Sequence, residues 1–341
     1  MDRRDYLRSL SALFATTFLG GSAAVAANSR SERALERADR AATRYDSQPT
    51  DELTLPAIPE DNLNFFLAND LGRNGYYEQK TIAELMGRVA ERIDIEFVVA
   101  PGDIHHFNGV ASTQDPLWMT NYELIYSHPD LMIDWFATCG NHEYRGNTRA
   151  VLDYGRVSRR WMMRDRYYSR LFELDKETVE IFFIDTTPLI GRYREKEEKY
   201  PDAGTQSIDD QLRWLEGALS ASKAKWKIVT GHHPLYADTD KSESERTDMR
   251  RHVEPLLDKY EVDMYLCGHI HNFQHIKPAG SRVDYVVNSA GSLSRRVKAI
   301  EGTRFCNDEA GFTLFSINDN AITFYMMNGK GKVLYQYTRT K

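Results

Sequence analysis

Cysteine is scarce in this chain: the 341 residues include three, Cys139, Cys267 and Cys306. An odd number cannot form a complete disulfide framework, which excludes a small disulfide-stapled scaffold and predicts that the three are buried as small apolar residues. Glycine (21) and proline (11) are too few for collagen, and 41% hydrophobic residues are too many for a disordered chain. The composition is that of a globular protein with a large core.

The chain also lacks an excess of positive charge, since 44 Lys and Arg face 50 Asp and Glu and the net charge is -6. No overall positive field recruits nucleic acid or an anionic membrane surface, so we expect neither nucleic-acid recruitment nor a stable membrane partner. Beyond the N-terminal region, the sequence has no hydrophobic run long enough to span a bilayer. An anionic substrate would therefore have to be held by a local device.

The N-terminal region has the pattern of an export signal. Arg3, Arg4 and Arg8 precede an apolar stretch over 10–27 that ends in small residues, which predicts a signal peptide over 1–26. The arginine pair resembles a twin-arginine signal, and an uncleaved membrane anchor is the alternative. The protein is accordingly expected to be exported, to the periplasm or the extracellular space.

The remaining chain divides into two parts. Residues 27–58 are polar and contain two prolines, which predicts a flexible lead-in, and residues 59–341 are expected to form a single domain. Short apolar runs that end in polar residues alternate there with helical patterns, so we expect an α/β fold. After residue 311 the pattern changes to three apolar runs separated by Asn- and Gly-rich turns, which predicts a C-terminal antiparallel meander.

Candidate metal ligands follow five of the apolar runs. The carboxyl ends of strands in a strand–helix sheet meet at one edge, so these residues are expected to converge. Seven of the ten histidines lie at such strand ends, which an ordinary structural role does not explain: His105, His106, His142, His232, His233, His269 and His271. The non-histidine candidates are Asp70, Asp103 and Asn141.

The chemistry of this set favours two metal ions. Carboxylate and amide oxygens are combined with imidazole nitrogens and no thiolate, a mixture that suits Fe, Zn or Mn and disfavours a structural zinc site. A single carboxylate can bridge two cations about 3.5–4 Å apart. One central aspartate with further ligands on either side would therefore make a bimetallic centre.

The ordered motifs resemble those of the calcineurin-like metallophosphoesterases: Asp70-Leu71-Gly72, Gly102-Asp103, Gly140-Asn141-His142-Glu143, Gly231-His232-His233-Pro234 and Gly268-His269-Ile270-His271. The segment from Gln211 to His232 is most similar to the purple and tartrate-resistant acid phosphatase branch. This resemblance implies two packed β-sheets flanked by helices.

The resemblance also implies roles for individual residues. One metal would be held by Asp70, Asp103 and His271, and the second by Asp103 as the bridge together with Asn141, His232 and His269. In this family the histidine of the Asn-His pair contacts the phosphate and assists the leaving group, which His142 matches. We also expect Asn141, His142 and His233 to bind substrate.

Two positions depart from the family pattern. The tyrosine that binds iron in purple acid phosphatases is replaced by His106, and the histidine that relatives without this tyrosine carry in their first motif is replaced by Gly72. We predict that His106 is a metal ligand and that both ions are divalent. The alternative is that His105 and His106 both lie around the ligands or in the substrate pocket, with water completing the coordination.

The resulting prediction is a bimetallic phosphatase that hydrolyses small phosphate monoesters through a metal-activated hydroxide. His142 would act as general acid or stabilise the transition state. A phosphodiesterase or nucleotide pyrophosphatase on the same core is the alternative, and a non-catalytic metal-bound binding protein is a further one. The arginine-rich stretch 145–170 could contact an extended anionic substrate, or it could be a solvated loop and helix.

Overall fold

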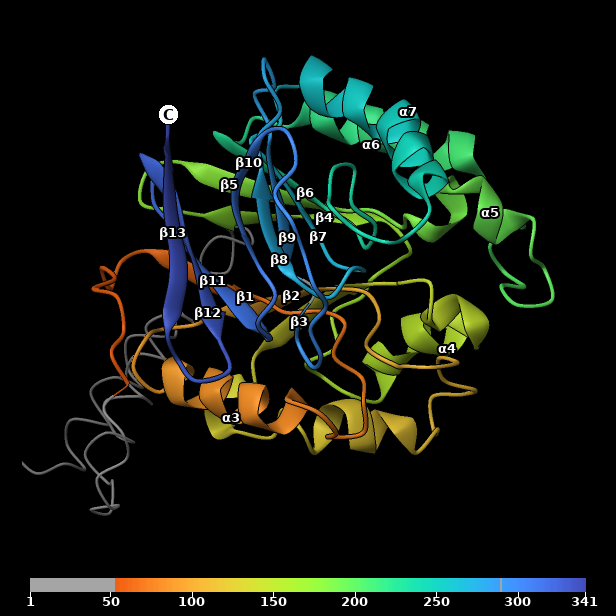
Figure 1. Cartoon of the computed structure of the whole chain (residues 1–341), viewed down its shortest axis with the longest axis horizontal. Coiled ribbons are helices and arrows are strands. Elements are labelled where there is room, and N and C mark those ends of the chain that lie inside the picture. The colour runs from red at the N-terminus through yellow and green to blue at the C-terminus, as the bar shows by residue number, and fades with distance from the viewer. Residues whose placement is uncertain (1–52, 289) are drawn as a thin grey trace, which may run out of the picture. The chain divides into compact units, whose positions relative to one another are not determined.

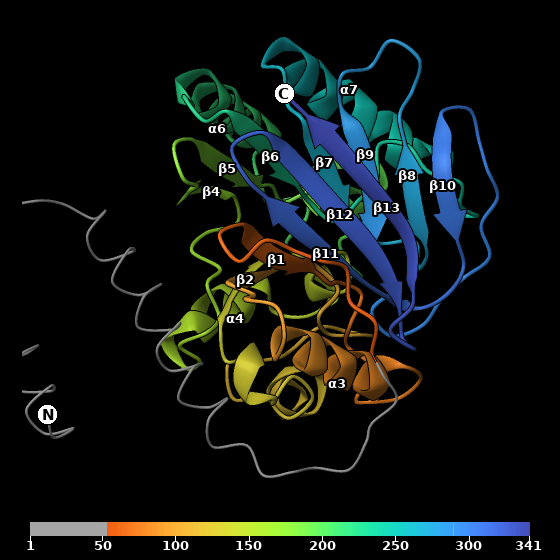
Figure 2. The same cartoon turned by 90° about the vertical axis from the view of Figure 1, so that its left-hand side faces the viewer.

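Two mixed β-sheets pack face to face and have helices on their outer sides (Figures 1 and 2). The computed structural model describes residues 53–288 and 290–341, within which Thr54–Lys341 forms one compact unit. The predicted signal peptide 1–26 and residues 27–52 of the lead-in lie outside the described residues. Among the described helices, none combines the length and the apolar character needed to cross a bilayer.

The first sheet has the strand order β13-β12-β11-β1-β2-β3. β1 pairs in parallel with β2, and β2 with β3, whereas β11, β12 and β13 pair antiparallel, which confirms the C-terminal meander. Its strands are β1 (Leu63–Leu67), β2 (Phe97–Pro101), β3 (Asp134–Thr138), β11 (Gly311–Ile317), β12 (Ala321–Asn328) and β13 (Val333–Thr340).

The second sheet has the order β10-β8-β9-β7-β6-β5-β4, and the strands β5, β6, β7 and β9 run parallel. The outer pairs β4–β5, β8–β9 and β8–β10 are antiparallel. Its strands are β4 (Tyr168–Glu173), β5 (Thr178–Phe183), β6 (Trp226–Thr230), β7 (Met264–Cys267), β8 (Phe273–Ile276), β9 (Asp284–Asn288) and β10 (Thr303–Asn307).

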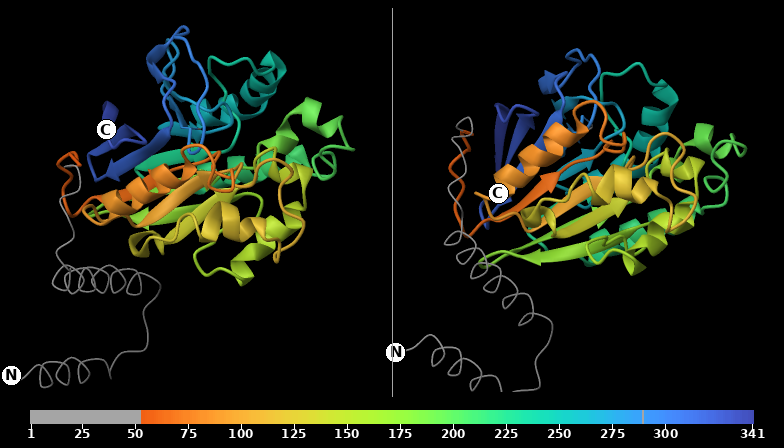
Figure 3. Two further views of the ribbon diagram at one scale, coloured as in Figure 1. Left: turned by 60° about the horizontal axis from the view of Figure 1, so that its bottom comes forward. Right: turned by 90° about the horizontal axis from the view of Figure 1, so that it is seen from below.

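The helices form the outer layers. α3 lies across the outer face of the first sheet (Figure 3) and buries the stripe that Ile82, Met86 and Val89 form at helical spacing. α6 and α7 lie outside the second sheet, and the Ser207 hydroxyl accepts a hydrogen bond from the Asp210 N–H at the N-cap of α6. The α-helices are α3 (Gln79–Ala90), α4 (Thr148–Asp153), α5 (Gly191–Arg194), α6 (Ile208–Ala221) and α7 (Glu243–Lys259).

Aromatic side chains join the two sheets. Phe97 of β2 stacks on Phe172 of β4 with ring centroids 4.2 Å apart, and Phe136 of β3 meets Phe172 edge-on at 5.7 Å. This core holds the sheets in register, so the carboxyl ends of strands from both sheets are kept next to one another. The predicted α/β fold of two packed sheets flanked by helices is confirmed.

All three cysteines are free thiols, and Cys139 and Cys267 are buried as predicted, whereas Cys306 is half-buried.

Candidate metal centre

The loops after β1, β2 and β3 of the first sheet and after β6 and β7 of the second carry the candidate ligands. Four of these residues have left-handed backbone conformations: Asp70 (φ 54°), Asp103 (54°), His269 (78°) and His271 (60°). Residues with a β-carbon adopt this region only when their surroundings impose it, and such residues cluster at functional sites. The chain turns sharply as it leaves each strand, which aims the side chains at a common point.

The Asp103 carboxylate lies at that point and is 1% exposed. Its Oδ2 is 3.3 Å from Nε2 of His232, 3.4 Å from Nε2 of His106 and 3.8 Å from Nε2 of His142. Its Oδ1 accepts the backbone N–H of His142 at 2.9 Å. Residues that lie far apart in the sequence therefore surround one carboxylate, as the strand-end pattern predicted.

Asp70 forms a second focus beside Asp103. Its Oδ1 is 3.6 Å from Nε2 of His271, and its Oδ2 accepts the backbone N–H of His269 at 2.8 Å. Four sets of the strand-end side chains offer ligand atoms within 4.8 Å of one another, and Asp103 belongs to two of them: Asp70–His106–His271, Asp70–Asp103–His232, Asp103–His106–His142 and His232–His233–His269.

Several buried polar atoms at the centre have no hydrogen-bond partner among the described residues, as expected if they bind metal ions. Within the described part of the chain, Asp70 Oδ1, Asn141 Oδ1 and both ring nitrogens of His106 are buried and accept or donate no hydrogen bond. Buried polar atoms are normally paired, so these atoms need a partner of another kind. Carboxylate, amide and imidazole donors are suitable ligands for divalent transition metals, and the residues therefore fit the implied ions.

Backbone carbonyls orient two of the imidazoles. Nδ1 of His232 donates to the Pro101 carbonyl at 2.9 Å, and Nδ1 of His271 donates to the Leu293 carbonyl at 3.3 Å. A carbonyl oxygen only accepts, so in each ring Nε2 is left to face the aspartates. This arrangement is how proteins hold histidines for metal binding.

His105 and His106 point to different places. His106 belongs to two of the ligand sets, whereas His105 is fully buried, stands edge-on to Trp118 and has its Nδ1 3.3 Å from the Asn121 amide. Burial lowers the pKa of His105 to about 3, so it is a neutral core residue. The geometry thus favours His106 as the candidate ligand, and its assignment stays a prediction.

Burial and charge act differently on the groups at the centre. Burial raises the pKa of Asp70 to about 8, against the opposing effect of His232. Burial also opposes ionisation of Asp103, but the neighbouring His232 and His142 hold its pKa well below the usual range. For His232, burial is outweighed by the Asp103 charge, which raises the pKa to about 9. Asp103 is therefore the permanent negative charge of the site.

Comparison with known proteins agrees with this geometry. The calcineurin-like phosphoesterase family matches residues 63–273. The chain belongs to this family. It is 32% identical over 308 residues to purple acid phosphatase 17 of Arabidopsis thaliana, covering 84% of this chain and 87% of the relative. It is 29% identical over 306 residues to tartrate-resistant acid phosphatase type 5 of Mus musculus, covering 83% and 92%.

A solved structure shows the same fold. GAP50, the anchor in the inner membrane complex of Plasmodium, superposes with a TM-score of 0.71 at 24% identity, covering 82% of this chain and 89% of that protein. The family match and the phosphatase relatives together show that the present chain is a hydrolase. The purple acid phosphatase relatives also imply a dinuclear metal centre. The family resemblance inferred from the motifs is therefore confirmed.

His142 and His233 occupy contrasting positions in this phosphoesterase. His142 is 9% exposed, and its Nδ1 donates to the Phe107 carbonyl at 2.6 Å, which turns Nε2 towards Asp103. Burial lowers the pKa of His142 to about 3, although Asp103 opposes this. His233 is fully buried, with Nδ1 2.8 Å from the Thr186 hydroxyl. Its role in substrate binding stays a prediction.

Several arginines of 145–170 make structural contacts. Arg160 is buried and pairs with Glu123 at 2.8 Å, Arg166 donates to the Tyr144 hydroxyl, and Arg149 pairs with Asp153. Arg145 donates to the Phe107 carbonyl (3.1 Å), in the loop that carries His106. The reading of this stretch as structural is favoured for these residues.

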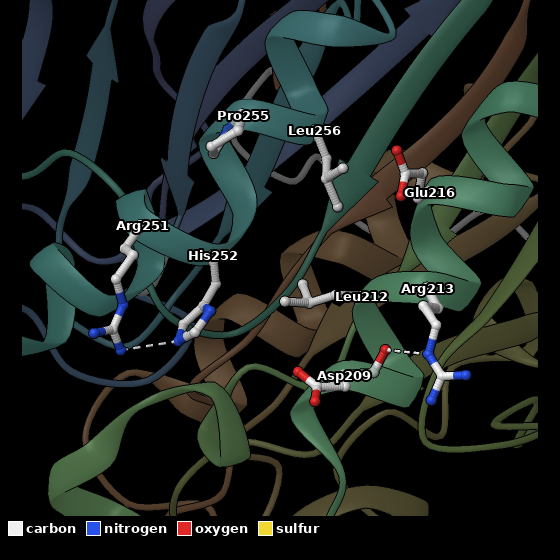
Figure 4. A pocket seen from close by; sticks show the side chains of 8 residues that line it. All are labelled: Asp209, Leu212, Arg213, Glu216, Arg251, His252, Pro255 and Leu256. Atoms are coloured by element: carbon white, nitrogen blue, oxygen red, sulfur yellow. Dashed lines mark hydrogen bonds between the residues drawn. The ribbon is translucent and has the colours of Figure 1, made fainter.

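A surface groove of about 530 Å³ lies between α6 and α7, apart from the metal centre (Figure 4). Its lining combines apolar side chains such as Leu212 and Leu256 with the charged Asp209, Arg213 and Arg251. None of the strand-end candidate ligands lines it.

Two buried glutamates support the ligands, and sequence reasoning assigned a role to neither. Glu143 lies in the Asn-His motif itself, and its carboxylate accepts the backbone N–H groups of Asp103 (2.8 Å), His105 (3.0 Å) and Gly140 (2.7 Å). It therefore ties the loop after β2 to the loop after β3. Burial, and next the Asp103 charge, raise the pKa of Glu143 to about 7.

Glu245 on α7 contacts His269, a candidate ligand in the loop after β7 of the second sheet. Its Oε2 is 3.0 Å from Nε2 of His269, while its Oε1 accepts hydrogen bonds from the Tyr193 hydroxyl and the Arg192 guanidinium. Because Nε2 of His269 donates to this carboxylate, Nδ1 remains free of a proton and faces His232 Nε2 at 3.2 Å. No spacing rule connects Glu245 to His269, so only a contact map could have found it.

We expect Glu143→Ala to lower the free energy of unfolding by about 2 kcal/mol or more, because it strands three buried backbone donors. Glu143→Gln keeps one acceptor oxygen and removes a negative charge beside Asp103, so it should lower the free energy of unfolding by less than Glu143→Ala does. Thermal unfolding measures both, with the exposed Glu197→Ala as the control. Equal melting temperatures for Glu143→Ala and Glu197→Ala would show that the Glu143 carboxylate does not stabilise the contact between the two loops.

We expect Glu245→Gln to weaken one of two metal-binding steps by about 10- to 100-fold, as loss of a carboxylate partner does for other metal-bound histidines. The matched control is Glu243→Gln, whose side chain is 61% exposed on the same helix. Calorimetric titration with Zn²⁺ measures each step. If both variants bind both ions as tightly as the wild type, Glu245 does not orient a ligand.

Proposed function

We propose that this phosphoesterase is an exported phosphatase that hydrolyses small phosphate monoesters with two divalent metal ions. The observation that carries the proposal is the shared Asp103 carboxylate, which is within 3.8 Å of imidazoles from three different loops. The predicted N-terminal signal motivates the export part. Fe, Zn and Mn all suit the donor set.

The proposed ligand sets follow the family resemblance, with His106 added to the first set. Asp70, Asp103, His106 and His271 would hold one ion, and Asp103, Asn141, His232 and His269 the other. Two bound cations would supply positive charge for the phosphate oxygens and lower the pKa of a water molecule. The proposed ligand sets contain only two carboxylates, so the centre with two divalent ions would keep a net positive charge and attract an anionic ester.

His142 is the proposed proton-transfer residue. Its Nδ1 carries the proton donated to the Phe107 carbonyl, so Nε2 is the atom that takes up or gives a proton on the Asp103 side. Burial disfavours the charged imidazolium, and a bound phosphate dianion would favour it again. His142 could then donate that proton to the departing alkoxide or to a phosphate oxygen.

Two variants separate metal binding from turnover. Asp103→Asn should lose both ions, whereas His142→Ala should keep both and lose about 100-fold or more in kcat. Metal content by elemental analysis and phosphate release from an aryl monoester measure the two effects. Equal metal loss in both variants would contradict this division of roles. Faster release of the aryl alcohol from an aryl diester than from the monoester would instead favour the phosphodiesterase alternative.

The replacement of the family's tyrosine by His106 predicts a holoenzyme without an intense visible absorption band, because an imidazole stands where the family has its iron-binding phenolate. His106→Tyr loaded with ferric iron should acquire such a band, since a phenolate would then reach the ion. Absorption spectra of the two iron-loaded proteins test this. An intense charge-transfer band in the oxidised wild-type holoenzyme would overturn the assignment of two divalent ions.

A further inference from the structure

Exposed aromatic side chains border the metal centre. Tyr77 is 68% exposed and Phe107 is 62% exposed, and each belongs to a loop that also carries candidate ligands. Phe107 directly follows His106, and Tyr77 lies seven residues after Asp70. Large apolar side chains exposed together mark binding surfaces more often than they occur by chance.

The two loops are fastened to each other. The Leu71 N–H donates to the Asp103 carbonyl at 3.0 Å, and the His106 N–H donates to the Gly72 carbonyl at 3.2 Å. A β-carbon on Gly72 would come within 1.9 Å of the Ile104 carbonyl oxygen, so this approach requires glycine. The aromatic residues are therefore held on one rim beside the ligands.

Arg73 joins the rings on this rim. Its guanidinium carbon lies 4.9 Å from the centroid of the Phe107 ring and 6.0 Å from that of Tyr77, within the range of cation–π contacts. The arginine is 8% exposed, and its Nε is buried without a hydrogen-bond partner among the described residues. We refer to Arg73, Tyr77 and Phe107 as the aromatic rim.

The aromatic rim is continuous with the proposed reaction centre. The Phe107 carbonyl accepts the hydrogen bond from His142, and the Phe107 ring centroid is 6.3 Å from the His142 ring and 6.2 Å from the His106 ring. This separation is similar to the span of a sugar ring. A phosphate at the metal ligands could thus belong to a molecule whose other end reaches Phe107.

Tyr77 adds a second, independent observation. Its backbone is left-handed, with φ 55°, which is an uncommon conformation for an aromatic residue. Such conformations persist where the surroundings impose them and often accompany binding sites. Here the result is a tyrosine ring held in solvent next to Arg73 rather than buried in the core.

We propose that the aromatic rim binds a planar aromatic group on the alcohol half of the phosphate ester, by stacking on Phe107 and Tyr77. This inference rests on the proposed function, since it assumes that the phosphate occupies the metal centre. The preferred substrates would be aromatic phosphate monoesters, with nucleoside monophosphates as the matching natural class. The guanidinium of Arg73 stabilises the stack from behind by its contacts with the ring faces.

The test compares adenosine 5′-monophosphate with ribose 5-phosphate, which release phosphate from the same kind of primary hydroxyl and differ in the aromatic base. We expect the full-length, metal-loaded protein to favour the nucleotide about tenfold in kcat/KM. Phe107→Ala should reduce this ratio about tenfold, a change equal to about 1.4 kcal/mol of stacking. Phe107→Tyr should preserve the ratio because it keeps a ring.

A matched control removes an exposed apolar side chain elsewhere. Leu171 on β4 is 55% exposed, so Leu171→Ala should leave the substrate ratio at its wild-type value. A wild-type ratio near one, or an unchanged ratio in Phe107→Ala, would overturn the proposal while leaving the phosphatase function intact.

A binding measurement covers the case in which neither ester is hydrolysed. The Kd values of the same two compounds, measured calorimetrically on the metal-loaded protein, should differ about tenfold and converge in Phe107→Ala. That outcome would support the aromatic rim while removing the proposed phosphatase function. Equal Kd values in the wild type, or no binding of either compound, would overturn the aromatic rim itself.

Discussion

The buried negative charge of Asp103 is the constraint on which the site depends. A buried carboxylate is costly unless cations or hydrogen bonds compensate it. Imidazoles from three loops face this one, and the backbone around it is correspondingly tight: a β-carbon on Gly140 would lie 2.3 Å from Asp103 Oδ1. Gly140 is therefore required by the close approach to this carboxylate, beyond the freedom that glycine gives to a turn.

The centre is shared between two sheets, so the packing of the core determines its geometry. Nδ1 of His232, after β6, donates to the carbonyl of Pro101 at the end of β2, and the N–H of His269, after β7, donates to Asp70, after β1. A slip between the sheets would separate these partners. The Phe97–Phe172 stack between β2 and β4 thus contributes to ligand distances although it touches no ligand.

The residues that hold the candidate ligands in place and those proposed to recognise the substrate are different groups. Glu143 fastens the loops of the first sheet, and Glu245 orients His269 from α7, so both carboxylates act on ligand geometry from within the protein. The aromatic rim lies instead at the solvent side, next to His142. The same Phe107 carries both functions, because its carbonyl orients His142 while its ring remains exposed.

The sequence alone determined the family, the α/β class and the set of candidate ligands, because ordered motifs after apolar runs are local features of the chain. It favoured His106 over His105 as a ligand only because His106 stands where the family has its iron-binding tyrosine, and it left open that both histidines lie around the ligands. Only the tertiary structure placed His105 against Trp118 and His106 beside Asp103. Glu245 and the contacts of Arg73 likewise depended on tertiary structure, because long-range packing decides which side chains meet.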